Sequence, residues 1–82
     1  MAGNIGLLTE QPTAPQLSLL SVVIPARDEE GCIASTVEHL HVGLRLHQVP
    51  HEIIVVNDGS HDQTWKILTE LATWLPELRP IL

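Results

Sequence analysis

The sequence predicts an α/β fold, a β-α-β-α-β unit with a Rossmann-like parallel sheet, and three observations lead to it. Two short runs rich in branched aliphatic residues, 19–24 and 53–56, are typical of strands buried on both faces of a parallel sheet. The segment between them has helical periodicity. Its length also exceeds the dozen or so residues that a crossover between parallel strands requires.

The first strand is expected over residues 17–24, because Pro25 has no N–H to continue the ladder. A helix is expected at about residues 29–46, with Asp28 as its N-cap. The acidic residues that follow Asp28 would stabilise the positive end of this helix. Its apolar positions recur at spacings of four, three and four, which places one stripe against the sheet: Ile33, Val37, Leu40 and Leu44.

The second half of the chain repeats the pattern. A strand is expected over 52–56 and a helix from Asp62 to the residue before Pro76. Ser60 and Gln63 have capping-box spacing, and Asp62 is an equally good cap. Residues 79–82 look like the opening of a third parallel strand, reached by right-handed crossovers.

Length and charge limit the classes of function. A chain of 82 residues suffices for one small domain, and residues 1–16, with scattered Gly and Pro, predict a flexible leader. The net charge is −6 and the four basic residues are dispersed, which argues against nucleic acid as a partner. No apolar run approaches the roughly 18 residues of a membrane helix, and no signal peptide is evident. We therefore expect no membrane segment and a cytoplasmic location.

Carboxylates follow both predicted strands at the point where each strand ends. The first strand leads into residues 25–30 and the second into 57–60. Carboxyl ends of neighbouring parallel strands form the crevice in which open α/β sheets bind ligands. The Asp58 carboxylate would accept N–H groups of a base, and Glu29 would reach the base or ribose. Gly59 permits a positive φ in a tight turn.

These residues carry a family resemblance. Val22-Val23-Ile24-Pro25-Ala26-Arg27-Asp28-Glu29-Glu30, followed by Ile54-Val55-Val56-Asn57-Asp58-Gly59-Ser60-His61-Asp62-Gln63-Thr64, resembles the N-terminal part of family 2 glycosyltransferases. The similarity is strongest to the polyprenyl-phosphate, or dolichyl-phosphate mannosyltransferase-like, branch. It covers residues 18–75. The resemblance implies a GT-A fold and transfer of a sugar from a UDP- or GDP-sugar to an acceptor such as a polyprenyl phosphate.

The resemblance also assigns nucleotide contacts. It implies that Asp58 is the main nucleoside-binding carboxylate and that the turn after it, with Gly59, belongs to the same site. The first segment would contact the nucleotide through Pro25, Ala26, Arg27, Asp28 and Glu29. Two positions depart from the family pattern. Arg27 replaces a frequent Tyr, so it would stack by its guanidinium, approach the phosphates or pair with Glu30. Asn57 replaces a frequent Asp.

Acidic turns repel a diphosphate, so Mg²⁺ or Mn²⁺ is expected to bridge the phosphates in the complete enzyme. The resemblance places the metal-binding Asp-x-Asp and the general base beyond the third strand. Residues 17–82 are thus expected to be a partial GT-A domain, truncated at its C-terminus, that binds no metal and is inactive alone. A longer parent would lie at the cytoplasmic face of a membrane.

The sequence also bears on three other classes of function. A nucleotidyltransferase would carry a Gly-rich basic loop after the first strand, and a dinucleotide-dependent oxidoreductase would carry Gly-x-Gly-x-x-Gly; neither motif is present. A non-catalytic interaction fragment is the remaining alternative. Its unpaired sheet edge would promote self-association.

The remaining residues of chemical interest have structural interpretations. The five histidines are expected at solvated helix and loop positions rather than in a metal site. Cys32, in the first turn of the helix, would have a lowered pKa or, the alternative that we favour, pack as a small residue near the sheet. Trp65 and Trp74 are expected to pack in the core or at an interface.

Overall fold

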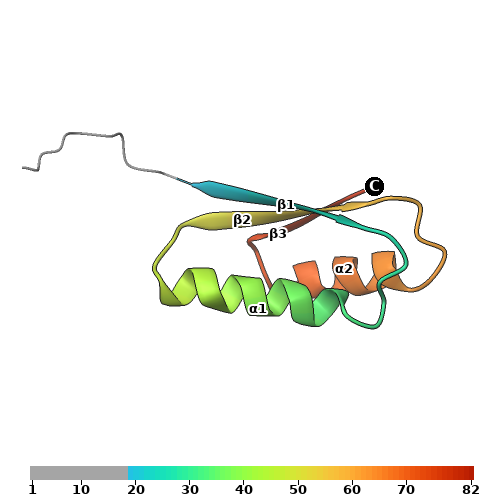
Figure 1. Ribbon diagram of the computed structural model, residues 1–82, viewed down its shortest axis with the longest axis horizontal. Coiled ribbons are helices and arrows are strands. Elements are labelled where there is room, and N and C mark those ends of the chain that lie inside the picture. Colours follow the sequence, from blue (N-terminus) through green and yellow to red (C-terminus); the bar gives the residue numbers. More distant parts are fainter. Residues whose placement is uncertain (1–18) are drawn as a thin grey trace, which may run out of the picture.

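The computed structural model describes residues 19–82, so the predicted leader lies outside the described residues. The order of elements is the predicted one (Figure 1). The elements are β1 (Leu20–Ala26), α1 (Ile33–Leu46), β2 (His51–Asn57), α2 (Thr64–Ala72) and β3 (Leu78–Ile81). The α/β class with alternating strands and helices is therefore confirmed.

The three strands form one parallel sheet in the order β1-β2-β3, with β2 in the centre. Ala26 at the end of β1 lies opposite Asn57 at the end of β2. Because the strands are parallel and in register, the loops that follow β1 and β2 leave the sheet at the same edge.

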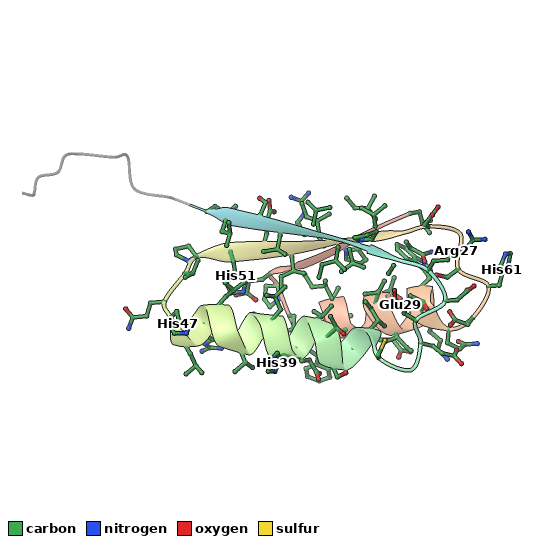
Figure 2. All side chains as sticks on the ribbon, in the orientation of Figure 1. Arg27, Glu29, His39, His47, His51 and His61 are labelled. Carbon is green, nitrogen blue, oxygen red and sulfur yellow. The ribbon has the colours of Figure 1, made fainter. Side chains whose placement is uncertain are left out.

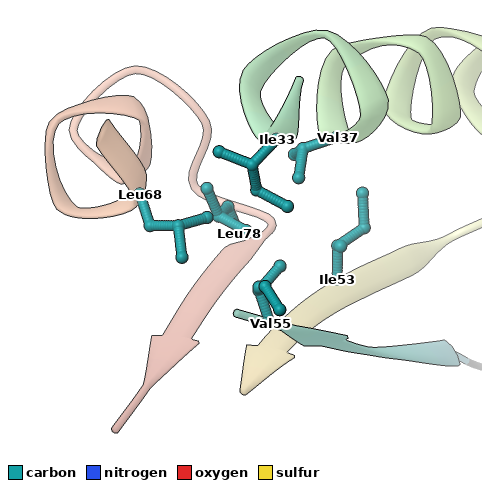
Figure 3. Packing of buried hydrophobic residues seen from close by; sticks show 7 residues of the cluster. Ile33, Val37, Ile53, Val55, Leu68 and Leu78 are labelled. Atoms are coloured by element: carbon teal, nitrogen blue, oxygen red, sulfur yellow. The ribbon is translucent and has the colours of Figure 1, made fainter. Parts of the chain in front are cut away.

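Both helices lie on one face of the sheet (Figure 1). That face carries the core, in which side chains from all five elements meet (Figure 3). The buried members are Ala26, Ile33, Val37, Ile53, Val55, Leu68 and Leu78. Leu40 packs against this cluster, so three positions of the predicted stripe on α1 face the sheet as expected.

The opposite face of the sheet is not covered by the described residues, and Val23 is 61% exposed there. Glu52 on this face accepts hydrogen bonds from Ser21 and, at 3.1 Å, from Arg79. These two contacts, the Ser21 bond first, lower the pKa of the Glu52 carboxyl. The prediction of strands buried on both faces is therefore wrong for this part of the chain. Branched aliphatic residues satisfy β propensity whether one face or two are covered.

β1 continues through Pro25 to Ala26, two residues beyond its predicted end. Carbonyl and N–H directions alternate along a strand, and the Ala26 carbonyl faces β2, where it accepts the Asp58 N–H at 2.8 Å. The absent N–H of Pro25 would point to the outer edge of β1, where no described strand pairs. Proline is tolerated at such an edge position.

α1 begins at Ile33 rather than near residue 29, and its N-cap position is Cys32, which makes no side-chain capping bond. Asp28 is not the cap, because its φ of 51° is left-handed and its side chain is bonded elsewhere. The first helical turn contains no acidic residue, so the predicted stabilisation of the helix start by acidic side chains is absent.

α2 begins at Thr64 and ends at Ala72, a shorter span than predicted. Ser60 and Gln63 do not form the capping box, since the Ser60 hydroxyl accepts a bond from the Asp28 N–H instead. Asp62 does act at the helix start, where its Oδ1 accepts the Thr64 N–H at 2.9 Å. Trp65 is half-buried, whereas Trp74, beyond the helix, is 82% exposed and does not belong to the core.

Candidate functional site

Two loops meet at the carboxyl edge of the sheet. Loop 1 covers residues 27–32 between β1 and α1, and loop 2 covers residues 58–63 between β2 and α2. Figure 2 shows Arg27, Glu29 and His61 gathered at this end of the molecule. The parallel register thus brings together the two sequence motifs that were predicted to share a site.

Asp58 is held at the end of the central strand by its own backbone, whose N–H bonds the carbonyl of Ala26 at 2.8 Å. Gly59 follows with a φ of 65°, as expected, so a side chain at this position would be strained. The turn leaves Asp58 exposed. An anchored backbone with an exposed carboxylate is well suited to accept N–H groups of a ligand.

Asp28 links the two loops in both directions. Its N–H donates to the Ser60 hydroxyl at 3.0 Å, and its Oδ1 accepts the His61 N–H at 2.6 Å. The left-handed backbone of Asp28, which Asp tolerates better than most residues, turns both groups toward loop 2. The carboxylate predicted to cap the helix or contact a nucleotide therefore positions loop 2.

Glu30 and Asp62 form a second reciprocal link. The Glu30 N–H donates to Asp62 Oδ2 at 3.2 Å, and Glu30 Oε1 accepts the Gln63 N–H at 2.8 Å. The suggested surface pair of Arg27 with Glu30 is not among the ion pairs of residues 19–82. Arg27 is exposed at the mouth of the loops.

Thr64 closes the set of links and was not singled out from the sequence. Its buried hydroxyl accepts the Glu29 N–H at 2.7 Å and donates to Asp62 Oδ1 at 2.5 Å. One hydroxyl thus ties the backbone of loop 1 to a carboxylate of loop 2. Only the tertiary pairing reveals this role, because Thr64 and Glu29 are 35 positions apart in the sequence.

The Thr64 side chain, first of several donors, lowers the pKa of the Asp62 carboxyl. A carboxyl whose pKa is lower in the folded state contributes stability above its unfolded pKa. That contribution is lost as the pH falls through the lower, folded pKa. We therefore expect the link through Asp62 to persist at neutral pH and to open only in acid.

Glu29 and Cys32 contact each other within loop 1. The Cys32 thiol lies 3.5 Å from Glu29 Oε1 and is exposed, so the prediction of a packed small residue is wrong. The hydrogen bond to Glu29, followed by smaller effects of burial and charge, raises the pKa of the Cys32 thiol. The alternative of a lowered pKa is therefore also contradicted. Glu29 itself is half-buried.

The raised pKa makes the Cys32 thiol a slow nucleophile. We expect iodoacetamide to alkylate it more slowly than a free cysteine near neutral pH, because only the thiolate reacts. Glu29→Gln should raise the rate several-fold and shift its pH profile to lower pH. Glu38→Gln, an exposed change on α1, is the control. Equal rates for the Glu29 variant and the parent would contradict this interpretation.

The family model described as "Glycosyl transferase family 2" matches residues 21–82, which include β1 from its second residue, both loops and β3. The chain belongs to glycosyl transferase family 2. The match covers both carboxylate-bearing loops, so the predicted family is confirmed.

Two relatives show how far the similarity extends. An undecaprenyl-phosphate 4-deoxy-4-formamido-L-arabinose transferase of Pectobacterium atrosepticum is 41% identical over 54 residues, which are 66% of this chain and 16% of that protein. A 4,4'-diaponeurosporenoate glycosyltransferase of Staphylococcus aureus is 44% identical over 48 residues, 58% of this chain and 12% of that protein. The chain therefore aligns with a small part of each relative. No solved structure shows significant similarity to it.

In this family 2 chain, the described carboxylates do not fit a divalent cation. Residues 19–82 contain no group of three or more His, Cys, Asp or Glu side chains placed to hold a metal. Asp28, Glu30 and Asp62 already accept backbone N–H groups. The expectation of Mg²⁺ or Mn²⁺ in a complete enzyme therefore finds no ligand set here and stays a prediction.

One further feature concerns the residue that ends β2. Asn57, where the family often has Asp, is 7% exposed, and its Oδ1 has no partner among the described residues. A carboxylate at this position would be a buried charge, which is more costly than a buried amide.

None of the described helices has the length and apolar character needed to span a bilayer.

Proposed function

We propose that loops 1 and 2 bind the nucleoside part of a nucleotide sugar, and that this chain is the nucleotide-binding portion of a glycosyltransferase. One observation carries the proposal. The exposed Asp58 carboxylate lies at the end of the central strand, at the start of loop 2, and loop 2 is hydrogen-bonded to loop 1 through backbone and side-chain groups. The donor base would be uracil or guanine, both of which present N–H groups to a carboxylate.

The roles within the two loops follow from what each side chain already contacts. Among residues 19–82 the Asp58 carboxylate has no hydrogen-bond partner and would accept a base N–H, whereas the Asp28 carboxylate already accepts the His61 N–H of loop 2. Pro25 and Arg27 are exposed on the approach to the same edge. We assign Arg27 to the phosphates, because its guanidinium offsets the negative charge of the loops. Glu29 would reach the ribose by leaving its contact with Cys32.

For the whole protein, we propose transfer of the sugar to a polyprenyl phosphate at the cytoplasmic face of a membrane. The Pectobacterium relative is named for an undecaprenyl-phosphate acceptor. The metal and the general base would come from residues other than the described ones. We therefore expect this chain by itself to release no nucleoside diphosphate from UDP- or GDP-sugars.

The test is a calorimetric titration of the full-length protein with UDP and GDP, with and without Mn²⁺. Asp58→Ala should weaken binding of the preferred nucleotide about 10- to 100-fold, the range for one lost hydrogen bond to a charged group. Asp58→Asn should give an intermediate loss. Glu70→Gln, which removes one exposed charge from α2, should leave binding unchanged. Unaltered binding by Asp58→Ala would refute the proposal.

A further inference from the structure

Two histidines at the other end of the sheet are buried, contrary to the prediction that all five are solvated. His41 on α1 is 7% exposed, and His51, the first residue of β2, is 8% exposed. Figure 2 shows His51 at the end of the molecule away from Arg27 and His61. Nothing in the proposed nucleotide site uses this pair.

The two imidazoles share one hydrogen bond. His41 Nδ1 lies 2.9 Å from His51 Nε2, and the ring planes are tilted by 54°, so the contact is not a stack. His51 Nδ1 lies 2.7 Å from the carbonyl oxygen of Val49. Because a carbonyl only accepts, His51 Nδ1 carries a hydrogen. In the neutral pair, His51 Nε2 is therefore the acceptor and His41 Nδ1–H the donor.

This arrangement accommodates one added proton but not two. The first proton leaves the shared bond intact in either of two forms. If His41 is the charged imidazole, its Nδ1–H donates to His51 Nε2. If His51 is the charged imidazole, its Nε2–H donates to His41 Nδ1. A second proton would place two N–H groups face to face and two positive charges within hydrogen-bond distance. The shared bond cannot survive in that state.

Two charged side chains lie beside the pair. Glu77 Oε1, just before β3, lies 4.0 Å from His41 Nδ1. His41, His51 and Glu77 line a cavity of about 600 Å³. Arg45, one turn further along α1, lines the same cavity, and its positive charge opposes a further positive charge there. The cavity is completed by residues of the loops before β2 and β3, with Trp74 at its rim: Gln48, Val49, Pro50, Leu75 and Pro76.

We propose that His41 and His51 form a proton-controlled latch that joins α1 to the start of β2 and is released when both imidazoles are protonated. Release would loosen α1 at its C-terminal half and open the cavity beside Trp74. The latch is independent of nucleotide binding, because its residues lie at the opposite edge of the sheet from loops 1 and 2.

The direct test is imidazole ¹⁵N NMR of the intact chain between about pH 8 and pH 5, the range in which imidazoles titrate. We expect both histidines in the Nδ1–H form at the upper end. On acidification the pair should take up one proton in a first step and the second only at clearly lower pH, together with loss of the shared bond. The exposed His39 is the internal reference. An Nε2–H form of His51, or two independent curves like that of His39, would overturn the proposal.

A second measurement uses stability. The latch implies that in acid the folded chain accepts one proton between the two imidazoles, whereas the unfolded chain accepts one on each. The free energy of unfolding of the wild type then falls as the pH decreases. Relative to His41→Gln, its unfolding equilibrium constant should rise up to tenfold for each pH unit of acidification. The variant lacks this effect because its one remaining imidazole of the pair can be protonated without conflict. His39→Gln should retain the wild-type slope. Equal slopes for the wild type and His41→Gln would contradict the latch.

Discussion

Leu68→Ala is expected to unfold most of the protein at room temperature. Leu68 is completely buried, and its side chain packs between α2 and the other members of the core (Figure 3). Truncation of a buried Leu to Ala costs about 2–5 kcal/mol, since the neighbours only partly fill the cavity. A core of this size supplies a net stability of only about 3–5 kcal/mol. Because both helices cover the same face of the sheet, residues 19–82 contain no second core that would compensate.

The measurement is urea denaturation followed by far-ultraviolet circular dichroism. Leu46→Ala removes the same atoms from a side chain that is 76% exposed on α1, and should change the unfolding free energy by less than about 0.5 kcal/mol. A Leu68 variant as stable as the Leu46 variant would mean that the core does not depend on α2.

Thr64→Val should weaken the link between the two loops without disturbing the core. Valine has the shape of threonine but lacks the hydroxyl that accepts the Glu29 N–H and donates to Asp62. The Glu29 N–H loses its partner at a part-buried position, so we expect a loss of about 1–3 kcal/mol. Nucleotide affinity of the full-length protein should fall as well, because Glu29 and Asp58 would no longer be held in one arrangement.

Amide hydrogen exchange locates the effect. In Thr64→Val the amides of Glu29 and Gln63 should exchange faster, whereas that of Val55 in the central strand should not change relative to global unfolding. Thr64→Ser retains the hydroxyl and should restore the slow exchange. If the amides of Thr64→Ser exchange as fast as those of Thr64→Val, the hydroxyl is not what protects them, and its role as a link between the loops is contradicted.

The bounds of β2 and β3 could be predicted from the sequence to within one residue and the start of α2 to within two, whereas the start of α1 could not. Residues 53–56 of β2 form a continuous apolar run between polar neighbours, so the signal for this strand is local. The start of α1 depends on hydrogen bonds from Glu29 and Glu30 to residues more than 30 positions away. Those bonds fix loop 1 in a non-helical form, and local capping rules do not register them.

The candidate site divides in the same way. Asp58 and Gly59 could be identified from the strand-turn pattern, and their backbone geometry agrees with it. Asp28 could be singled out as a residue of interest, but its contacts with loop 2 could not be predicted. A carboxylate that follows a strand can cap a helix, bind a ligand or link two loops, and the local sequence does not distinguish these roles. The burial of His41 and His51 was likewise missed. His41 lies four positions after the buried Val37, on the side of α1 that faces the sheet, but its polar residue type hides this placement. His51 follows Pro50 in the loop that was predicted to be solvated.

The amino-acid sequence by itself determined the alternation of strands and helices and the family, because hydrophobic periodicity and turn motifs are local properties. The tertiary structure alone decided which carboxylates remain free, since Asp28, Glu30 and Asp62 find their donors across the gap between loops. It also decided which histidines are buried and which face of the sheet is covered. Each of these depends on contacts between distant segments, whose partners no local pattern specifies.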